Sequence, residues 1–395
     1  MTVTIPIQAT TEPSTRPYQI CSRTIMDTTD SSITFDEDGV CDHYHNYFNE
    51  EARYVRKDEA GSAILHETAE RIRKHGRGRK YDCILGLSGG VDSTYLCLLA
   101  KELNLNPLVV HFDNGWNSEL AVCNIENTVK RLGFDLYTYV VDWPEFRDLQ
   151  RSYFKANVVD IEVLTDHGFM AVLYQQAMKH RIRFVLAGMN IVTEAILPQN
   201  WIYDKSNLVN IKEIQRQFGT IPPEKLRSYP MLSPHHRRFY DRVLRLEVVS
   251  PLNYVDYSYD NVKARITEEL AWREYGGKHY ESVFTRFYQG YILPRKFGFD
   301  KRRAHLSTLI CSGQITREEA MRRISQPGYP QEQCDIDRPF VLKKLGFSED
   351  EFEQYLAVPR VEHNVFGAGT SLYNQYPVLK PLRPIVNLIF RRKSA

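Results

Sequence analysis

Apolar residues in the first half of the chain alternate between short continuous runs and helical spacing. Short runs rich in apolar residues predict strands at 81–87, 107–112, 135–141 and 184–187, the first of them buried. Apolar residues that recur every three or four positions predict helices over 91–103, 119–132 and 168–180. Strands that alternate with helices predict an α/β fold with a parallel, doubly wound sheet. A ligand of such a sheet binds at the carboxyl ends of the strands.

The pattern changes on both sides of this region. Residues 49–79 carry an amphipathic helical pattern, and after residue 205 Tyr, Arg, Glu and Leu at helical spacing predict a mainly helical region. We therefore expect five parts: a flexible lead-in at 1–17, a small loop-rich, cysteine-containing subdomain at 18–48, an α/β domain at 49–205, a mainly helical region at 206–360 and an extended tail at 361–395.

The composition narrows the class of protein. Of the 395 residues, 43% are apolar and 25% charged, which is typical of a soluble globular protein and excludes an integral membrane protein. The 51 basic residues nearly balance the 49 acidic ones, so we expect no nucleic acid among the partners. The seven cysteines are scattered, and no apolar secretory stretch follows Met1, so we expect a reducing, cytoplasmic location.

The most informative segment is Ser88-Gly89-Gly90-Val91-Asp92-Ser93, between the first strand and its helix. Adjacent glycines let backbone N–H groups approach phosphate oxygens, and the following helix points its positive end at the anion. A Walker A loop requires a Lys before the last Ser or Thr, and a dinucleotide turn has the pattern G-x-G-x-x-G, so neither matches. Because a carboxylate repels phosphate, Asp92 implies a bridging Mg²⁺.

Glu194 and a group of cations are the other candidates that the residues themselves suggest. Glu194 follows the fourth strand, where its carboxylate can reach the same Mg²⁺ as Asp92. Release of a negatively charged leaving group requires positive charge nearby. The densest cluster of cations in the chain is Lys296, Lys301, Arg302, Arg303 and His305. Lys278 and His279 lie in a second turn that can contact phosphate.

The Ser88–Ser93 loop resembles the S-G-G-x-D-S loop of the PP-loop ATP pyrophosphatases. Four further segments resemble the N-acetyl sugar amidotransferases of that superfamily, and the resemblance extends from about Tyr18 to Pro359. These segments are His111–Trp116, Thr165–His167, Gly188–Glu194 and Lys296–His305. The resemblance implies the PP-loop type of sheet.

The resemblance also implies the activity. ATP with Mg²⁺ would adenylate an acetamido oxygen of a UDP-sugar, such as UDP-2,3-diacetamido-mannuronic acid, and release pyrophosphate. Ammonia would then displace AMP and give an acetamidino sugar for lipopolysaccharide O-antigen biosynthesis. Residue 2 is Thr and no G-x-C-x-G elbow occurs, so the chain has no glutaminase nucleophile of its own. The family implies a separate class I glutaminase with a cyclase-like companion.

Combined with the residues, the resemblance implies three sets of site residues. The catalytic set is Asp92, Glu194, Lys296, Lys301 and Arg302, with Asp92 and Glu194 also binding Mg²⁺. The ATP-binding set is Ser88, Gly89, Gly90, Asp92, Ser93, Asp113, Asn114 and Gly188. The substrate-binding set is Asp166, His167, Asn190, Thr193, Lys278, His279, Arg303 and His305.

Structural alternatives accompany these roles. Thr193 and Glu194 are also typical helix caps, and Asp166-His167 is a common helix start. Asp113-Asn114-Gly115 forms turns readily without any ligand. The cations are equally consistent with a solvated helix face or with a clamp for sugar-nucleotide phosphates.

The amino-terminal cysteines depart from the family pattern. Relatives usually carry C-x-x-C twice, which gives a four-thiolate zinc site. Here Cys21 and Cys41 remain, and Thr24 and Tyr44 stand at the second positions. With His43 or His45 as substitutes the pair offers at most a weak Zn²⁺ site, so we expect the subdomain to fold without metal.

Two other functions compete with this interpretation. A tRNA-modifying PP-loop ligase or thiolase needs a basic RNA-binding surface and, for sulfur chemistry, paired reactive cysteines; the balanced charge and scattered cysteines argue against it. A non-catalytic nucleotide-binding subunit would keep the loop but not need Asp92 and Glu194, and this chain has both.

Overall fold

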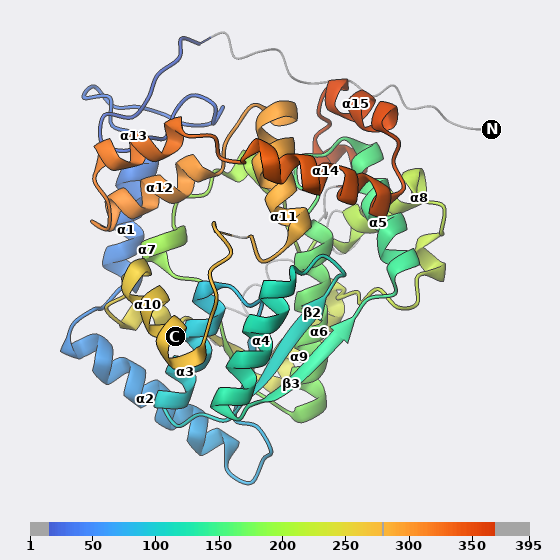
Figure 1. The fold of residues 1–395 in the computed structure, drawn as a ribbon. Helices are drawn as coiled ribbons and strands as arrows, with labels where there is room; N and C mark the ends of the chain where they lie inside the picture. The colour runs from blue at the N-terminus through green and yellow to red at the C-terminus, as the bar shows by residue number, and fades with distance from the viewer. Residues whose placement is uncertain (1–15, 279, 368–395) are drawn as a thin grey trace, which may run out of the picture.

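A five-stranded sheet in which all neighbouring strands are parallel forms the centre of the protein (Figure 1). The computed structural model describes residues 16–278 and 280–367. The strand order is β3-β2-β1-β4-β5. The bounds are β1 Cys83–Gly86, β2 Pro107–Asp113, β3 Asp135–Val140, β4 Phe184–Leu186 and β5 Glu247–Val249. The predicted α/β class with a parallel, doubly wound sheet is confirmed.

Helices make up most of the remaining structure. Up to the end of β4 they are α1 Asp42–Tyr54, α2 Glu59–Gly76, α3 Val91–Glu102, α4 Glu119–Leu132, α5 Trp143–Ala156 and α6 Val163–His180. After β4 come α7 Ile191–Glu194, α8 Leu208–Phe218, α9 Pro234–Leu244, α10 Tyr259–Leu270, α11 Val283–Phe287, α12 Arg302–Cys311, α13 Arg317–Ser325, α14 Gln331–Leu345 and α15 Glu349–Ala357, with a π-helical stretch at Tyr288–Phe297. The expected helical carboxyl-terminal region is therefore present.

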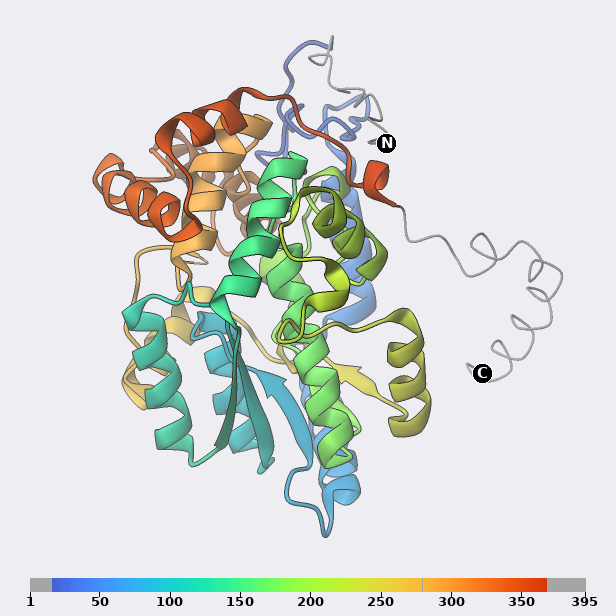
Figure 2. The ribbon, with the colours of Figure 1, turned by 90° about the vertical axis from the view of Figure 1, so that its right-hand side faces the viewer.

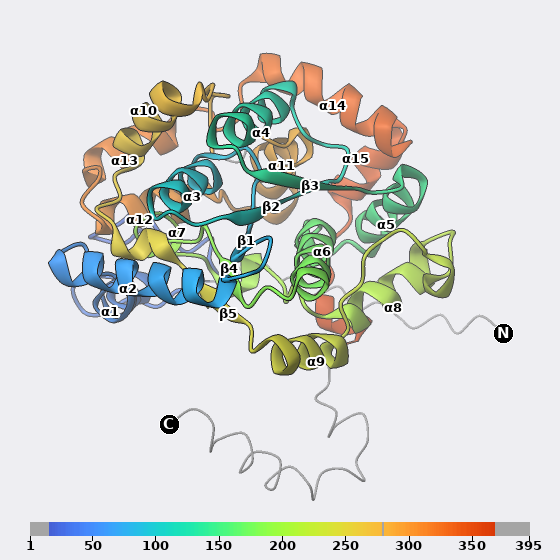
Figure 3. The ribbon, with the colours of Figure 1, turned by 90° about the horizontal axis from the view of Figure 1, so that it is seen from below.

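The strands β1, β2 and β4 are buried on both faces, which explains why they are continuous apolar runs, whereas the edge strand β3 is mainly exposed. Successive side chains of a strand point to opposite faces. Ile84 packs into the core that contains α5 and α6, whereas Cys83 and Leu85 pack into the core that contains α2, α3 and α10. Figure 3 shows α3 and α4 on one side of the sheet and α6 on the other.

Three elements differ from the sequence-based expectation. The short strand β5 lies in the region expected to be helical and pairs with β4 at the sheet edge. Helix α1 occupies the end of the subdomain expected to be loop-rich. Helix α5 was not among the expected helices, although Asp142 caps it and Pro144 stands in its first turn. At three residues, β5 is too short for an alternating pattern to reveal it.

The parallel sheet brings several loops to one edge. The segments after β1, β2, β4 and β5 all leave the sheet at its carboxyl end. The helices α11 to α15 lie above this edge, as Figures 1 and 2 show from two directions. Residues from the second half of the chain therefore cover the place where a ligand of this fold is expected.

A buried ion pair joins two of these covering helices. Arg286 of α11 donates two hydrogen bonds to Asp337 of α14, at 2.6 and 2.7 Å. The Asp337 side chain is 2% exposed, and it also accepts hydrogen bonds from Tyr329 and Gln333. Removal of one partner leaves a buried charge without compensation, which is more costly than the pair itself is stabilising.

We expect Asp337→Ala to lower the free energy of unfolding by about 3–5 kcal/mol, because the Arg286 guanidinium remains buried. Urea unfolding followed by circular dichroism measures the change. The matched control is Asp335→Ala on the exposed face of the same helix, for which we expect a change within about 0.5 kcal/mol. Equal losses in the two variants would contradict the role given to the pair.

Candidate functional site

The loop at residues 88–93 connects β1 to the start of α3. Gly89 has a φ of +83°, and a Cβ atom there would lie 2.7 Å from the carbonyl oxygen of Ala121, so only glycine fits. The Ser88 hydroxyl accepts a hydrogen bond from the Gly90 N–H at 3.2 Å, and the Ser93 hydroxyl donates to the Gly90 carbonyl. The result is a tight turn next to the positive end of α3, as the sequence predicts.

Space in front of Gly90 is kept open by the missing side chain. A Cβ atom at Gly90 would lie 3.3 Å from a carboxylate oxygen of Glu281 and 3.4 Å from the hydroxyl oxygen of Tyr275. Both residues belong to the segment between α10 and α11. This segment therefore passes directly over the loop, which the spacing in the sequence does not reveal.

Asp92 lies in the first turn of α3 and is held by two donors. The Tyr257 hydroxyl donates a hydrogen bond to its Oδ1 atom, and Asn190 Nδ2 donates to the same oxygen at 3.3 Å. Burial together with the Asp92 charge raises the pKa of Tyr257, so this hydroxyl keeps its proton. Asp92 is thus oriented by residues from two other loops.

Glu194 is the last residue of the short helix α7. The helix is capped by Asn190, whose side-chain oxygen accepts from the N–H and the hydroxyl of Thr193, both at 2.9 Å. Glu194 is therefore not needed as a cap. Its carboxylate instead forms an ion pair with Lys278, with 2.9 Å between Oε1 and Nζ.

Lys278 sits among carboxylates. Burial opposes its charge, but the fields of Glu194 and Asp92 more than compensate and raise its pKa. The ammonium group is therefore charged at neutral pH. A Cβ atom at Gly188, two residues after β4, would lie 3.7 Å from backbone atoms of Asp92 and Ser93, so the loop after β4 lies next to the start of α3.

These contacts bring part of the predicted set together. Ser88, Gly89, Gly90, Asp92, Ser93, Gly188, Asn190, Thr193, Glu194 and Lys278 form one connected group, and His305 joins it through a 3.1 Å contact between its Nδ1 and the Thr193 carbonyl. His279 lies outside the described residues. Four residues of the group do not follow from the sequence analysis: Tyr257, Tyr275, Glu281 and Asn253. The side-chain oxygen of Asn253 accepts a hydrogen bond from the Ile191 N–H at 2.9 Å.

Other predicted residues are engaged within the protein. The Asp113 carboxylate accepts hydrogen bonds from the Gly115 N–H and from Asn117, and the first of these closes the turn that Asp-Asn-Gly favours. The Asn114 side chain donates to Thr165. Their role toward ATP stays a prediction.

Asp166 and His167 lie on α6. Asp166 is 3.2 Å from Lys205. The buried His167 donates from Nδ1 to the Lys205 carbonyl and accepts at Nε2 from the Leu232 N–H. Burial lowers the pKa of His167, so the ring is neutral.

The dense cation cluster separates in three dimensions. Lys296 donates to Asn157 and to the carbonyls of Tyr355 and Val358, and burial lowers its pKa to about 8. Arg302 pairs with Asp300 at 2.7 Å, and Arg303 pairs with Asp27 at 3.0 Å.

The positive charge of Lys301 stabilises the carboxylate of the buried Asp160. Burial alone would raise the pKa of Asp160, but the charges of Lys205 and Lys301 outweigh burial and lower it. The contacts recorded for Lys296, Lys301, Arg302 and Arg303 are thus with the protein itself. A catalytic role for Lys296, Lys301 or Arg302 stays a prediction.

The cysteine-containing segment is held together by local hydrogen bonds. The Cys41 N–H donates to Cys21 Sγ at 3.2 Å, and the Thr24 hydroxyl lies 3.7 Å from Cys41 Sγ. His43 pairs with Asp30 and His45 with Asp36, so neither imidazole supplements the two thiols. Within residues 16–278 and 280–367, no group of three His, Cys, Asp or Glu side chains is arranged to hold a metal.

The same segment is attached to the carboxyl-terminal helices. Arg303 of α12 pairs with Asp27 and donates to the Ile25 carbonyl at 2.9 Å. Arg317 of α13 donates to the carbonyls of Thr24 and Cys21, each at 3.0 Å. Two arginines, one from α12 and one from α13, therefore hold this amino-terminal segment in place.

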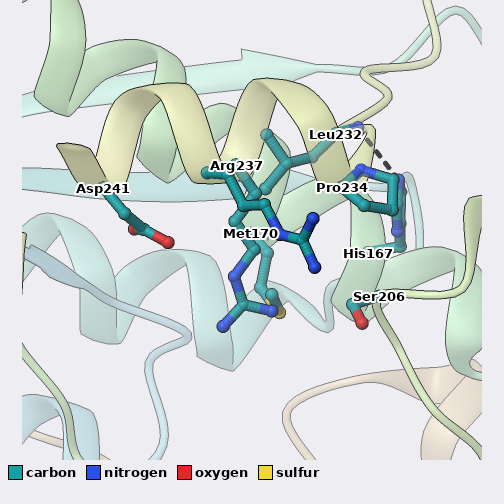
Figure 4. Close-up of a pocket in the computed structure, with 8 residues that line it drawn as sticks. His167, Met170, Ser206, Leu232, Pro234, Arg237 and Asp241 are labelled. Atoms are coloured by element: carbon teal, nitrogen blue, oxygen red, sulfur yellow. Dashed lines mark hydrogen bonds between the residues drawn. The ribbon is translucent and has the colours of Figure 1, made fainter. Parts of the chain in front are cut away.

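A separate hollow of about 320 Å³ lies between α6 and α9 (Figure 4). Its lining combines an apolar floor with polar and charged groups: His167, Met170, Ser206, Leu232, Pro234, Arg237, Arg238 and Asp241. Within the described parts of the chain, neither Arg237 nor Arg238 forms an ion pair with a carboxylate.

None of the helices in the described parts of the chain combines the length and apolarity needed to cross a bilayer.

Comparisons with known proteins give three further observations. One matching relative is the uncharacterized protein MJ1599 of Methanocaldococcus jannaschii, 26% identical over 263 residues, which are 65% of this chain and 76% of the relative. An NH₃-dependent NAD synthetase from Campylobacter jejuni covers 53% of this chain and 83% of its own, at 16% identity and a TM-score of 0.29. An NMN synthetase from Francisella tularensis covers 56% and 100%, at 12% identity and a TM-score of 0.28.

A family model matches the last quarter of the chain. Its description is LPS biosynthesis protein WbpG-like, C-terminal domain, and it aligns with residues 281–379. This range contains the segment Lys296–His305, on which the resemblance to the sugar amidotransferases chiefly depends. Residues 281–379 are therefore similar in sequence to the C-terminal domain of WbpG-like LPS biosynthesis proteins.

Proposed function

We propose that the protein is an ATP-dependent N-acetyl sugar amidotransferase, which forms AMP and pyrophosphate and converts an acetamido group of a UDP-sugar into an acetamidino group. The observation that carries the proposal is the arrangement around Ser88–Ser93, where a glycine-containing turn at the start of α3 lies beside two carboxylates, Asp92 and Glu194, from different loops. The WbpG-like domain at 281–379 supports a sugar substrate of lipopolysaccharide biosynthesis.

The donor set fits Mg²⁺ bound together with ATP. Mg²⁺ is usually held by one or two carboxylates and the phosphates of its substrate, and not by a complete protein cage. Asp92 and Glu194 would supply the two carboxylates, whose fields both act on Lys278. When bound there, Mg²⁺ would neutralise the phosphate oxygens and make pyrophosphate a better leaving group.

The residues of the chain divide the work as follows. The N–H groups of the loop and the start of α3 hold phosphate oxygens, while Asn190 and Tyr257 orient Asp92. An acetamido oxygen then attacks the α-phosphorus, the bond to the pyrophosphate oxygen breaks, and Lys278 can follow the charge that develops on the leaving group. Ammonia adds to the activated carbon, loses a proton and displaces AMP, so that NH replaces the oxygen.

For the diphosphate end of the sugar nucleotide we propose the hollow between α6 and α9, with the sugar extending from it toward the loop at Ser88–Ser93. Its volume, about 320 Å³, is at the lower end of small-molecule sites, and its two guanidinium groups suit a diphosphate or a uronic carboxylate. His167, which the sequence analysis assigns to the substrate, lies on its wall, where its hydrogen bonds to Lys205 and Leu232 make it a support for the hollow.

Ammonia is proposed to come from a separate class I glutaminase with a cyclase-like companion, and free ammonium should replace both in vitro. The assay combines the purified protein with ATP, Mg²⁺, ammonium and a panel of UDP-diacetamido sugars. We expect AMP and pyrophosphate in equal amounts, with a sugar product in which NH replaces oxygen in the mass spectrum. Formation of ADP, or of AMP only when tRNA is added, would refute the proposal.

We expect Asp92→Asn to reduce kcat by at least about 100-fold, because an electrostatic contact to the reacting groups is lost. The fold should persist, since the amide oxygen of asparagine can still accept from Tyr257. The matched control is Asp256→Asn, an exposed carboxylate one residue from Tyr257, which should leave turnover unchanged. A non-catalytic nucleotide-binding subunit would instead show no turnover in the wild type and only altered ATP affinity in the variant.

We expect Arg238→Ala to raise KM for the UDP-sugar by about tenfold while KM for ATP stays constant, because one charge-assisted contact to the substrate is lost. Steady-state kinetics with each substrate varied in turn measures both constants. Arg242→Ala, on the same helix but outside the lining of the hollow, is the control. A parallel change in both KM values would place the sugar nucleotide elsewhere.

A further inference from the structure

The segment between α10 and α11 crosses the phosphate loop, and we call residues 271–278 and 280–282 the strap. Its first part is fixed to the site, because Trp272 Nε1 donates to the Gly89 carbonyl at 2.9 Å. Arg273 exchanges two hydrogen bonds with Asn124 of α4, at 2.8 and 2.9 Å. Near its other end, the Glu281 carbonyl accepts from the Ser118 N–H at 2.8 Å.

Between these anchors the strap contains two glycines. Gly276 has a φ of +89°, and a Cβ atom there would meet nothing within 4 Å. A backbone of this kind can change its dihedral angles without steric cost. Lys278 follows directly, so its side chain can be repositioned while the anchors at Trp272 and Glu281 stay in place.

In the structure, Lys278 binds one of the two carboxylates proposed to hold Mg²⁺. Its Nζ atom is 2.9 Å from Glu194 Oε1, and the side chain is only 18% exposed. The second carboxylate, Asp92, accepts hydrogen bonds from Tyr257 and Asn190. Both metal-binding carboxylates are therefore engaged by donors of the protein itself.

We propose that Lys278 occupies the position of the divalent metal while no nucleotide is bound, so that the metal enters the site only together with ATP. The proposal rests on the proposed function for the assignment of the metal site alone. An ammonium group and a divalent cation repel each other and compete for the same oxygen of Glu194. The phosphates of ATP tip the balance, because they add charge for the metal and offer the ammonium group a new partner.

The consequence is a fixed order of events at the site. Free metal binds weakly to the protein without nucleotide, because Lys278 must leave Glu194 with no compensating contact. With nucleotide present, Lys278 transfers from Glu194 to a phosphate oxygen, while the anchors of the strap at Trp272 and Glu281 stay in place. Lys278 is in this sense a positioning residue that links metal binding to nucleotide binding.

The test measures Mn²⁺ binding by electron paramagnetic resonance, without nucleotide and with a non-hydrolysable ATP analogue. We expect Lys278→Met to bind Mn²⁺ at least about tenfold more tightly than the wild type in the absence of nucleotide, the size of effect that one close charge produces. Lys278→Arg, which keeps the charge, should bind as weakly as the wild type. The analogue should tighten Mn²⁺ binding strongly in the wild type and much less in Lys278→Met.

The matched control is Lys263→Met. Lys263 of α10 pairs with Glu274 of the strap at 2.7 Å, so this variant removes a lysine charge that contacts the strap without touching Glu194. Its Mn²⁺ affinity should equal that of the wild type. Tight Mn²⁺ binding by the nucleotide-free wild type, or an unchanged affinity in Lys278→Met, would overturn the proposal.

Hydrogen exchange of the wild type provides a second measurement that needs no variant. Saturating Mn²⁺ without nucleotide should speed amide exchange in residues 272–278, and Mn²⁺ with the analogue should slow it. Exchange that is indifferent to both additions would count against the proposal. Failure of the sugar amidotransferase assay leaves these metal-binding results in force, so the two proposals can fail separately.

Discussion

Negative charge beside an anion-binding turn is the constraint on which the rest of the site depends. Asp92 stands in the first turn of α3, where phosphate is expected, and Glu194 adds a second carboxylate. Without compensation these groups would repel each other and any phosphate. The protein balances them with the Lys278 ammonium group and with hydrogen bonds from Tyr257 and Asn190, each from a segment outside the turn.

This requirement explains why the α/β part of the chain does not complete the site. The sheet supplies the turn, Asp92 and Glu194, but the strap, which lies next to the WbpG-like domain, supplies the cation. Tyr257 comes from the segment that connects β5 to α10, and Asn253 of the same segment caps α7 by accepting from Ile191. The small edge strand β5 thus serves mainly to direct this segment toward the loop.

The sequence predicts what depends on local pattern, and misses what depends on distant pairing. The strands, the turn at 88–93 and the position of Glu194 follow from apolar runs and glycine, which act over a few residues. Tyr257 and Asp92 are separated by 165 residues, so no spacing rule connects them. Lys296, Arg302 and Arg303 form one cluster in the sequence. In the structure Lys296 belongs to the π-helical stretch and Arg302 and Arg303 belong to α12, and the three side chains contact different groups.

The contacts of Arg303 and Arg317 with the amino-terminal segment affect when that segment can fold during synthesis on the ribosome. The segment from Cys21 to Cys41 leaves the exit tunnel well before the arginines that hold its backbone carbonyls, which are about 280 to 300 residues behind. Such non-local contacts form late, because a long loop must close before they contribute. This segment is therefore translated early but is among the last to reach its native structure.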